Sequence, residues 1–265
     1  IENYYNKSFE EVRRLFGDVH LIFIDPVDKH RNVAAALRLE NFNLFKVASK
    51  LFLRKPSKVF FYPPKPTPFK PKKLRKILVE RQTDILFLKF ACLERVPDIL
   101  WGQMYKTQRV IQNFLEKSEF KVLRSKSWSD EKKFNVLVFE LENKSLKNVK
   151  KHYGPPVASK EEEKFVSKYI SNPKTVSGPY IENGRWVVLV KRKQTDAKAL
   201  LKEKLKSSGR DIGVASRILK AIEKGFKILV NQEILDFYRK NPSFAVFLTE
   251  FLRGKPIWLE QSYSG

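Results

Sequence analysis

The 265-residue sequence has few of the residues that form disulfides and metal clusters. Cys92 is the single cysteine, which excludes a disulfide within the chain and a cluster of thiolate ligands. His20, His30 and His152 are too scattered along the sequence to predict a zinc site. Cys92 directly follows an apolar segment, which favours a small core residue. We therefore expect a protein of the reducing cytoplasm.

Long apolar runs and nucleotide-binding loops are also absent. No run approaches the roughly 18 apolar residues of a membrane span, so we expect no membrane partner. The first residues have neither the basic nor the apolar segment of a secretory signal. The sequence contains no G-x-x-x-x-G-K-[ST] loop and no G-x-G-x-x-G fingerprint. Because the chain begins at Ile1 without Met, we expect a fragment or one subunit of a split enzyme.

Acidic residues are scarce relative to basic ones. Fifty-three Lys and Arg stand against 29 Asp and Glu, which gives a formal net charge of +24. The basic residues gather in four segments, at 70–76, 144–151, 191–193 and 198–206. A polyanion is the natural partner, because each neutralised phosphate releases condensed counterions. A Lys-rich surface of the thermophile kind is the alternative, but such surfaces usually carry matching Glu.

Proline divides the sequence into two parts. The segment 63–71 holds five prolines in nine residues, which favours a stiff, extended connector over a helix or a central strand. The elements predicted before it are a helix at 9–16 ended by Gly17, a buried strand at 19–24, a helix from Asn32 to about Lys55, and an extended piece at 59–62.

Strands and helices alternate after the prolines. The predicted elements are a helix at 72–80, then a strand at 84–90, a helix at 99–117, strands at 120–127 and 134–141, a helix at 160–170 and a strand at 186–190. From strand 84–90 onward this order is β-α-β-β-α-β, typical of a ferredoxin-like unit with a four-stranded antiparallel sheet and two helices on one face. The remaining predicted elements are helices at 196–207, 212–230 and 232–239 and a last one from Asn241 to Arg253.

A charged corner follows the apolar run Leu21–Ile24. Asp25-Pro26 ends that run, because proline has no N–H to donate and restricts the residue before it. We expect Asn32 to cap the helix that follows. From the residues alone, this corner is either a charged surface turn with a good cap or a binding site.

Three stretches resemble one known family. Asp25–Leu37, DPVDKHRNVAAAL, resembles the D-P-x-D-x-x-R-N-V-A stretch of the archaeal-type (class I) CCA-adding enzymes, which are tRNA nucleotidyltransferases. Tyr180–Trp186, YIENGRW, resembles the family's F-I-E-N-G-R-W stretch. A weaker match, Val96–Ile99, precedes a basic helix. The three occur in family order, and the similarity fades after about residue 195.

The resemblance implies an α+β fold and a division into domains. The family chain is described as head, neck, body and tail. By this resemblance, residues 1–62 are the C-terminal part of the substrate-binding body, 63–71 are the Pro-rich junction, 72–195 are a ferredoxin-like βαββαβ tail domain, and 196–265 are a helical C-terminal extension.

The same resemblance implies that catalytic residues lie elsewhere. In the family, carboxylates in the head hold Mg²⁺ beside a Gly-Ser motif, and this sequence has no Gly-Ser dipeptide that leads into an Asp-x-Asp strand. We expect no catalytic residue and no metal ligand here, so the chain alone should be inactive. The catalytic head and neck, fused or in trans, would be a partner, with CTP and ATP as substrates of the complete enzyme.

Recognition residues are implied on the matching positions. Arg31 corresponds to the body arginine that helps to read the incoming C or A, with Asp25 and Asp28 as its neighbours. The expected RNA contacts are Lys106, Arg109, Lys144, Lys147, Lys150, Lys151 and Arg185. For Lys106 and Arg109 a solvated role is the alternative. For Arg185, packing of the last strand is favoured over RNA contact.

The implied partner is the acceptor and TΨC arms of tRNA, whose duplex would be read by shape. Whether the chain forms a homodimer stays open. Two other functions remain as alternatives: a non-catalytic RNA-binding protein on the same scaffold, and a basic assembly module for an acidic protein. The aromatic RNP1 pattern is absent from 134–141, so the sequence does not indicate base stacking on the predicted sheet.

Overall fold

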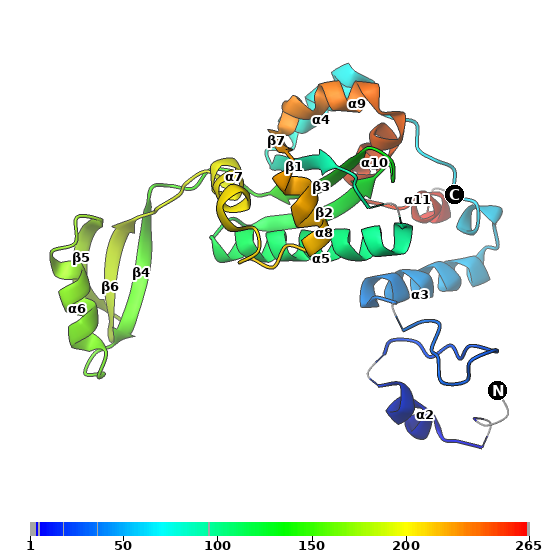
Figure 1. Ribbon diagram of the computed structural model, residues 1–265, viewed down its shortest axis with the longest axis horizontal. Coiled ribbons are helices and arrows are strands. Elements are labelled where there is room, and N and C mark those ends of the chain that lie inside the picture. The colour runs from blue at the N-terminus through cyan, green and yellow to red at the C-terminus, as the bar shows by residue number, and fades with distance from the viewer. Residues whose placement is uncertain (1–3, 5, 18, 36, 95, 264–265) are drawn as a thin grey trace. The chain divides into compact units, whose positions relative to one another are not determined.

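The computed structural model describes residues 4, 6–17, 19–35, 37–94 and 96–263 (Figure 1). The chain forms two compact units, one of residues 1–66 with 252–265 and one of residues 67–251. The first boundary lies within the Pro-rich segment 63–71. In the described part of the chain, no helix is both long enough and apolar enough to cross a membrane.

The first unit contains short helices with well-defined ends. α2 (Phe9–Phe16) begins at Ser8, which forms a capping box with Glu11, and ends at Gly17 as predicted. The other elements are α3 (Leu39–Arg54), the 3-10 helix η1 (Lys58–Phe60) and α11 (Ile257–Tyr263). α11 packs against α3 and η1, where the ring centroids of Trp258 and Phe60 lie 5.8 Å apart.

The segment around Asn32 differs from the prediction. The helix begins at Leu39 instead of Asn32, because Asn32 bonds to the backbone of its own loop and caps no helix. Residue 36, which belonged to the predicted helix, lies outside the described residues. The predicted strand 19–24 is reduced to one bridge between Ile24 and Asn32. The first two residues of the extended piece predicted at 59–62 lie in the 3-10 helix η1.

The second unit is built on a four-stranded antiparallel sheet. Its strands are β1 (Asp84–Ala91), β2 (Val122–Ser129), β3 (Phe134–Leu141) and β7 (Phe226–Val230), in the order β2-β3-β1-β7. α4 (Pro71–Glu80) precedes β1 and begins at a proline, one residue before the predicted start at residue 72. In β1, Leu86 and Leu88 pair with Phe139 and Leu137 of β3 and point to the same face.

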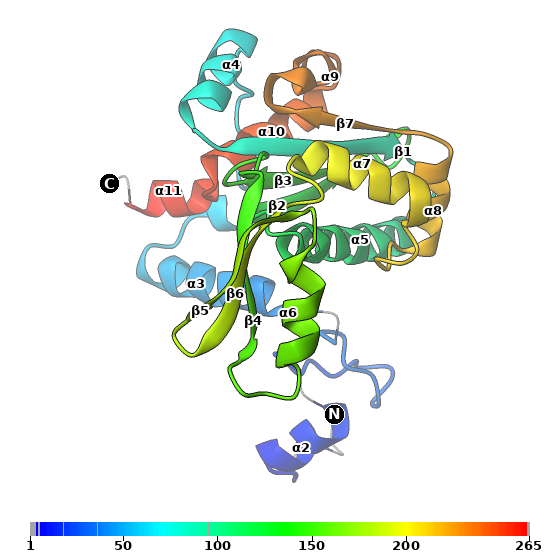
Figure 2. The ribbon, with the colours of Figure 1, turned by 90° about the vertical axis from the view of Figure 1, so that its left-hand side faces the viewer.

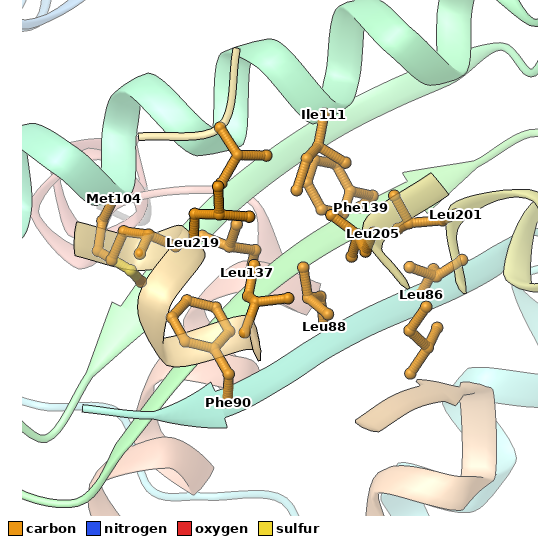
Figure 3. Close-up of a cluster of buried hydrophobic side chains, with 14 of the residues drawn as sticks. Leu86, Leu88, Phe90, Met104, Ile111, Leu137, Phe139, Leu201, Leu205 and Leu219 are labelled. Carbon is orange, nitrogen blue, oxygen red and sulfur yellow. The ribbon is translucent and has the colours of Figure 1, made fainter. Parts of the chain in front are cut away.

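Helices cover both faces of this sheet. On one face α5 (Pro97–Lys117), α7 (Ala197–Ser208) and α8 (Ser216–Glu223) enclose the largest core, in which Met104, Ile111 and Leu219 meet the strands (Figure 3). On the other face α9 (Leu235–Lys240) and α10 (Pro242–Arg253) bring in Phe237 and Phe244, whose rings meet Trp128 edge to face. Both faces are therefore closed.

The α+β class is confirmed, but the prediction assigned two elements to the wrong sheet. The order β1-α5-β2-β3-α8-β7 is ferredoxin-like, with α8 and β7 in place of the predicted helix 160–170 and strand 186–190. Residues 212–230 are a helix and a strand instead of one helix. Gly225, at φ +142°, ends the helical region in a conformation that other residues rarely adopt, so that Phe226–Val230 can pair with β1.

The misassigned elements belong to a small second sheet between β3 and α7. It contains β4 (Val149–Pro156), α6 (Glu162–Ile170), β5 (Thr175–Glu182) and β6 (Arg185–Lys191), with strand order β4-β6-β5. Figure 2 shows α6 along one face of this sheet. β4 and β5 were not predicted, because Gly, Pro and charged residues interrupt their apolar pattern.

Candidate nucleic-acid interface

Hydrogen bonds between residues close in sequence organise the corner at residues 25–34. Asp25 Oδ1 accepts from the backbone N–H of Val27 at 2.9 Å and of Asp28 at 3.3 Å. Asp28 Oδ1 accepts from the N–H of His30 at 3.0 Å, and the Asp28 carbonyl accepts from the N–H of Arg31 at 3.0 Å. These bonds fold the predicted corner into a tight polar turn.

Asn32 closes this turn from the inside. Its side chain is buried; Oδ1 accepts from the N–H of Phe23 and of Ala34, and Nδ2 donates to the carbonyl of Leu21. One amide thus satisfies three backbone groups on both sides of the turn. The residue next to it in sequence, Arg31, is held at its backbone while its side chain stays outside.

The Arg31 guanidinium is available to a ligand. Nη1 lies 3.5 Å from Asp25 Oδ2, and 67% of the Arg31 side chain is exposed. The pKa of Asp25 is lowered, first by its backbone hydrogen bonds from Val27 and Asp28 and to a smaller extent by Arg31. Asp25 therefore stays ionised and keeps one face of the guanidinium oriented, which leaves other N–H groups free to bind acceptors.

Neither carboxylate at this corner suits a divalent metal ion. Both Asp25 and Asp28 already accept backbone N–H groups, which hold them as turn residues rather than as a converging pair. In the described residues, no three His, Cys, Asp or Glu side chains gather where they could hold a metal ion. The described carboxylates of this corner therefore do not fit Mg²⁺.

Lys106 and Arg109 lie on the outer face of α5. The inner face buries Leu100, Met104 and Ile111, and Gln108 bonds to Ser125 and Ser127 of β2. Since residues three apart share a helix face, the exposed Lys106 and Arg109 present their charges side by side to solvent.

The lysines of 144–151 are unequal in their surroundings. Lys150 Nζ lies 2.5 Å from Glu119, and Lys151 Nζ lies 2.7 Å from Glu182, a contact that raises the pKa of Lys151. Lys144 Nζ is 3.9 Å from Asp196, too far for a strong pair, and Lys147 is exposed.

Arg185 has a structural contact of its own. Its Nε and Nη2 both donate to the carbonyl of Gly154, at 3.1 and 2.9 Å, and so join β6 to β4 at the end of the small sheet. These two N–H donors of Arg185 are therefore already used in a contact within the protein.

A cleft between the small sheet, α5 and α7 gathers further basic residues. It has a volume of about 970 Å³, and its lining includes the acids Glu119 and Glu203. Eight cations also line it: Lys117, Lys150, Lys168, Lys174, Lys191, Arg192, Lys193 and Lys204. We call this the basic cleft. Glu119 pairs with both Lys150 and Arg192 and thereby ties the end of α5 to β4 and β6.

The basic cleft contains only Lys150 of the predicted RNA contacts. The charge pattern marked 191–193 and 198–206 as basic segments, but it gave no sign that they face α5 and α6. Lys168 and Lys174, on and just after α6, had no signal beyond their charge, because only the folded small sheet brings them to the same cleft. Arg31 belongs to the other unit of the chain.

Two family models match the chain. The model described as CCA-adding enzyme, C-terminal domain, matches residues 81–231, more than half of the chain, and the one described as tRNA nucleotidyltransferase, second domain, matches residues 2–62. Curated relatives carry the same description. The CCA-adding enzyme of Methanosarcina mazei is 37% identical over 233 residues, which cover 88% of this chain and 50% of that protein.

Other archaeal proteins give similar matches. The CCA-adding enzyme of Archaeoglobus fulgidus is 38% identical over 172 residues, 65% of this chain and 38% of that protein. The CCA-adding enzyme of Haloarcula marismortui is 30% identical over 253 residues, 90% of this chain and 53% of that protein. The chain spans about half the length of the curated relatives it matches.

Proposed function

Since the chain belongs to the family of CCA-adding enzymes, we propose that it is the tRNA-binding body and tail portion of an enzyme that adds or repairs the 3′-terminal CCA of tRNA. CTP and ATP are the proposed substrates of the whole enzyme, and the cytoplasm is its proposed location. The observation that carries the tRNA-binding role is the basic cleft, where eight cations face two acids in a chain of net charge +24.

The contacts proposed for tRNA are mainly to phosphates of the acceptor and TΨC arms. Lysine and arginine in a cleft can follow an RNA backbone without reading its bases, and an A-form duplex offers shape rather than base edges. Lys106, Arg109 and Lys147 are exposed and add to this surface. Lys150 and Lys151 contribute less free charge, because each is paired with a glutamate.

We further propose that Arg31 reads the incoming nucleotide from the body, with the division between body and tail at residues 63–71. The exposed guanidinium beside Asp25 supports this role. Because the carboxylates that the structure describes beside Arg31 do not fit Mg²⁺, the metal-dependent chemistry is assigned to a catalytic head and neck segment, fused or in trans.

A salt titration tests the tRNA-binding proposal. The logarithm of the tRNA association constant should fall linearly with the logarithm of salt concentration, with a slope of several units. Replacing Lys174 and Lys193 of the basic cleft by Ala should reduce that slope by about one unit for each lost phosphate contact.

The matched control replaces two exposed lysines outside the cleft, Lys220→Ala and Lys240→Ala, which remove the same charge. The control should lose less affinity than the cleft variant and keep more of the slope. A salt-independent association, or equal losses in both variants, would contradict a tRNA site in the cleft.

A further inference from the structure

The two central strands of the main sheet, β1 and β3, present no exposed aromatic ring to an RNA base. All but the first residue of β3 is buried, and β1 is buried at Ile85 to Leu88 and at Phe90. Helices cover both faces, so the rings of Phe87 and Phe139 are inside the protein. If this chain stacks bases, the stacking surface lies on another element.

The small sheet has one open face. Its other face packs on α6, where His152 stacks on Phe165 and a Cβ on Gly154 would come within 2.6 Å of that ring. The open face carries one row across all three strands: Tyr153 of β4 and Tyr180 of β5 both pair with Val187 of the central strand β6. We call this row the tyrosine face.

The geometry of this row resembles a platform with two rings. Val187 is fully buried in the middle, whereas Tyr153 is 59% exposed. Because neighbouring strands lie about 4.8 Å apart, the two tyrosines start from backbones roughly 10 Å from each other. Lys151 lies on the same face, with Nζ 5.5 Å from the centre of the Tyr153 ring.

An irregularity in β5 places Tyr180 on this face. Between Ser177 and Tyr180 the register shifts, so that three residues of β5 oppose two of β6. Side chains alternate between faces, so without this extra residue Tyr180 would point toward α6. Gly178 occupies the shift at φ +93°, where a Cβ would lie 2.9 Å from the carbonyl of Val187.

Positive charge borders the tyrosine face at the end of β6. Lys191 stands on the same side of β6, four residues or about 13 Å from Val187, and it also lines the basic cleft. The open face and the cleft therefore adjoin at Lys191. A partner that fills both has a chain of phosphates and planar groups that can lie on the exposed ring of Tyr153 and the half-buried ring of Tyr180, which describes a single-stranded stretch of RNA.

We propose that Tyr153 and Tyr180 stack on unpaired bases of an RNA strand whose phosphates lie in the basic cleft, an inference that rests on the proposed tRNA-binding function and assigns a ligand to a second surface. The open arrangement suits sequence-tolerant binding, because every base presents a π-face. The small sheet thus adds contacts to unpaired nucleotides, beyond those that the cleft makes with a duplex.

Binding of a labelled single-stranded RNA of about eight nucleotides and of a duplex of the same length tests this proposal. Tyr153→Ala and Tyr180→Ala should each weaken the single-strand complex about fivefold to 150-fold, the range of one lost base–aromatic stack. Duplex affinity and the salt slope of binding should stay unchanged, because no cation is removed. Tyr153→Phe should bind like the unsubstituted chain.

The control is Tyr62→Ala, which removes a tyrosine that is 81% exposed and stands outside the small sheet. If Tyr180→Ala fails to fold, Tyr153→Ala still decides the question, since most of that side chain is exposed. Single-strand affinity unchanged in Tyr153→Ala overturns the proposal, and so does an equal loss for the duplex. An acidic peptide whose binding needs Tyr153 while RNA binding does not would overturn it too.

The two proposals fail separately. Salt-dependent tRNA binding with no effect of the tyrosines removes the stacking surface and leaves the proposed function. Tyrosine-dependent binding of single strands without affinity for tRNA leaves the stacking surface and removes the proposed function.

Discussion

The buried side-chain amide of Asn32 holds the backbone of the turn and thereby positions the neighbouring Arg31. Its three hydrogen bonds to Leu21, Phe23 and Ala34 fix both sides of the turn. A buried, satisfied amide is costly to remove, so the backbone of this turn is well held. The Arg31 side chain, 67% exposed, can then turn toward a ligand without disturbing the fold.

Arg31→Ala is expected to impair nucleotide choice more than tRNA binding. In a full-length enzyme that contains this chain, the catalytic efficiency of C and A incorporation should fall. The loss should correspond to about 1–3 kcal/mol, the contribution of one good base-reading contact. Arg31→Lys should restore little, because an ammonium lacks the planar fork. Incorporation kinetics and tRNA affinity are measured on the same protein.

Lys29→Ala is the matched control, because it removes one positive charge from the same turn. Lys29 contributes its carbonyl to the hydroxyl of Tyr4, a contact that the substitution keeps. Normal incorporation in Arg31→Ala, or an equal defect in Lys29→Ala, would rule out a nucleotide-reading Arg31.

Elements of the main sheet are joined at one end by Glu140. This carboxylate of β3 accepts from Arg124 of β2 at 2.6 Å, from Arg81 after α4 at 2.8 Å, and from Thr83 just before β1 at 2.7 Å. Burial by itself would raise the pKa of Glu140, but these hydrogen bonds together lower it below its ordinary value. Glu140 therefore stays charged and stabilises the contacts between four elements.

Glu140→Gln is expected to lower the free energy of unfolding at pH 7 by about 3 kcal/mol, the lower end for breaking a buried ion pair, since Arg81 and Arg124 remain 27% and 31% exposed. The lowered pKa adds stability that is present above the unfolded-state value, about 4.3, and is lost as pH falls through the folded value. Urea unfolding should therefore show a smaller difference in the free energy of unfolding between the unsubstituted chain and Glu140→Gln at about pH 3.5 than at pH 7.

The control for this prediction is Glu142→Gln. Glu142 lies just after β3 and pairs with Lys121 at 3.4 Å, but 53% of its side chain is exposed. A surface pair of this kind contributes less than about 1 kcal/mol. Equal losses of unfolding free energy in Glu140→Gln and Glu142→Gln would contradict a stabilising role of the buried Glu140 contacts. A loss in Glu140→Gln that does not change with pH would contradict it as well.

At the scale of the whole molecule, the two matched family models and the two proposed recognition surfaces lie on different units of the chain. The model of the tRNA nucleotidyltransferase second domain covers the unit with Arg31, and the C-terminal-domain model covers the main and small sheets. The carboxylates near Arg31 are turn residues that do not fit a metal. Nucleotidyl transfer needs carboxylates that hold divalent ions.

We therefore predict that the 265-residue chain by itself binds tRNA but adds no nucleotide. Incubation of the purified chain with tRNA lacking CCA, Mg²⁺, CTP and ATP should leave the tRNA length unchanged. A full-length member of the family is the positive control. Extension by the pure chain would show that a catalytic site exists among these residues.

The sequence by itself determined much of this protein. The strong apolar periodicity of 84–90, 99–117 and 134–141 predicted β1, α5 and β3 close to their observed bounds, because β1 and β3 are buried over most of their length and α5 buries one regular face. The stretch at Asp25–Leu37 likewise indicated the family.

Only the tertiary structure decided which strands share a sheet. The strand 186–190 has the same apolar pattern whether it pairs with β1 or with β4 and β5, and pairing partners are chosen by packing that local pattern does not contain. β7 joins the main sheet because Gly225 frees it from the preceding helix and its Phe226 and Ile228 complete the core. The basic cleft and the tyrosine face exist only once the small sheet forms, since their residues lie far apart in sequence and gain their common surface from strand pairing.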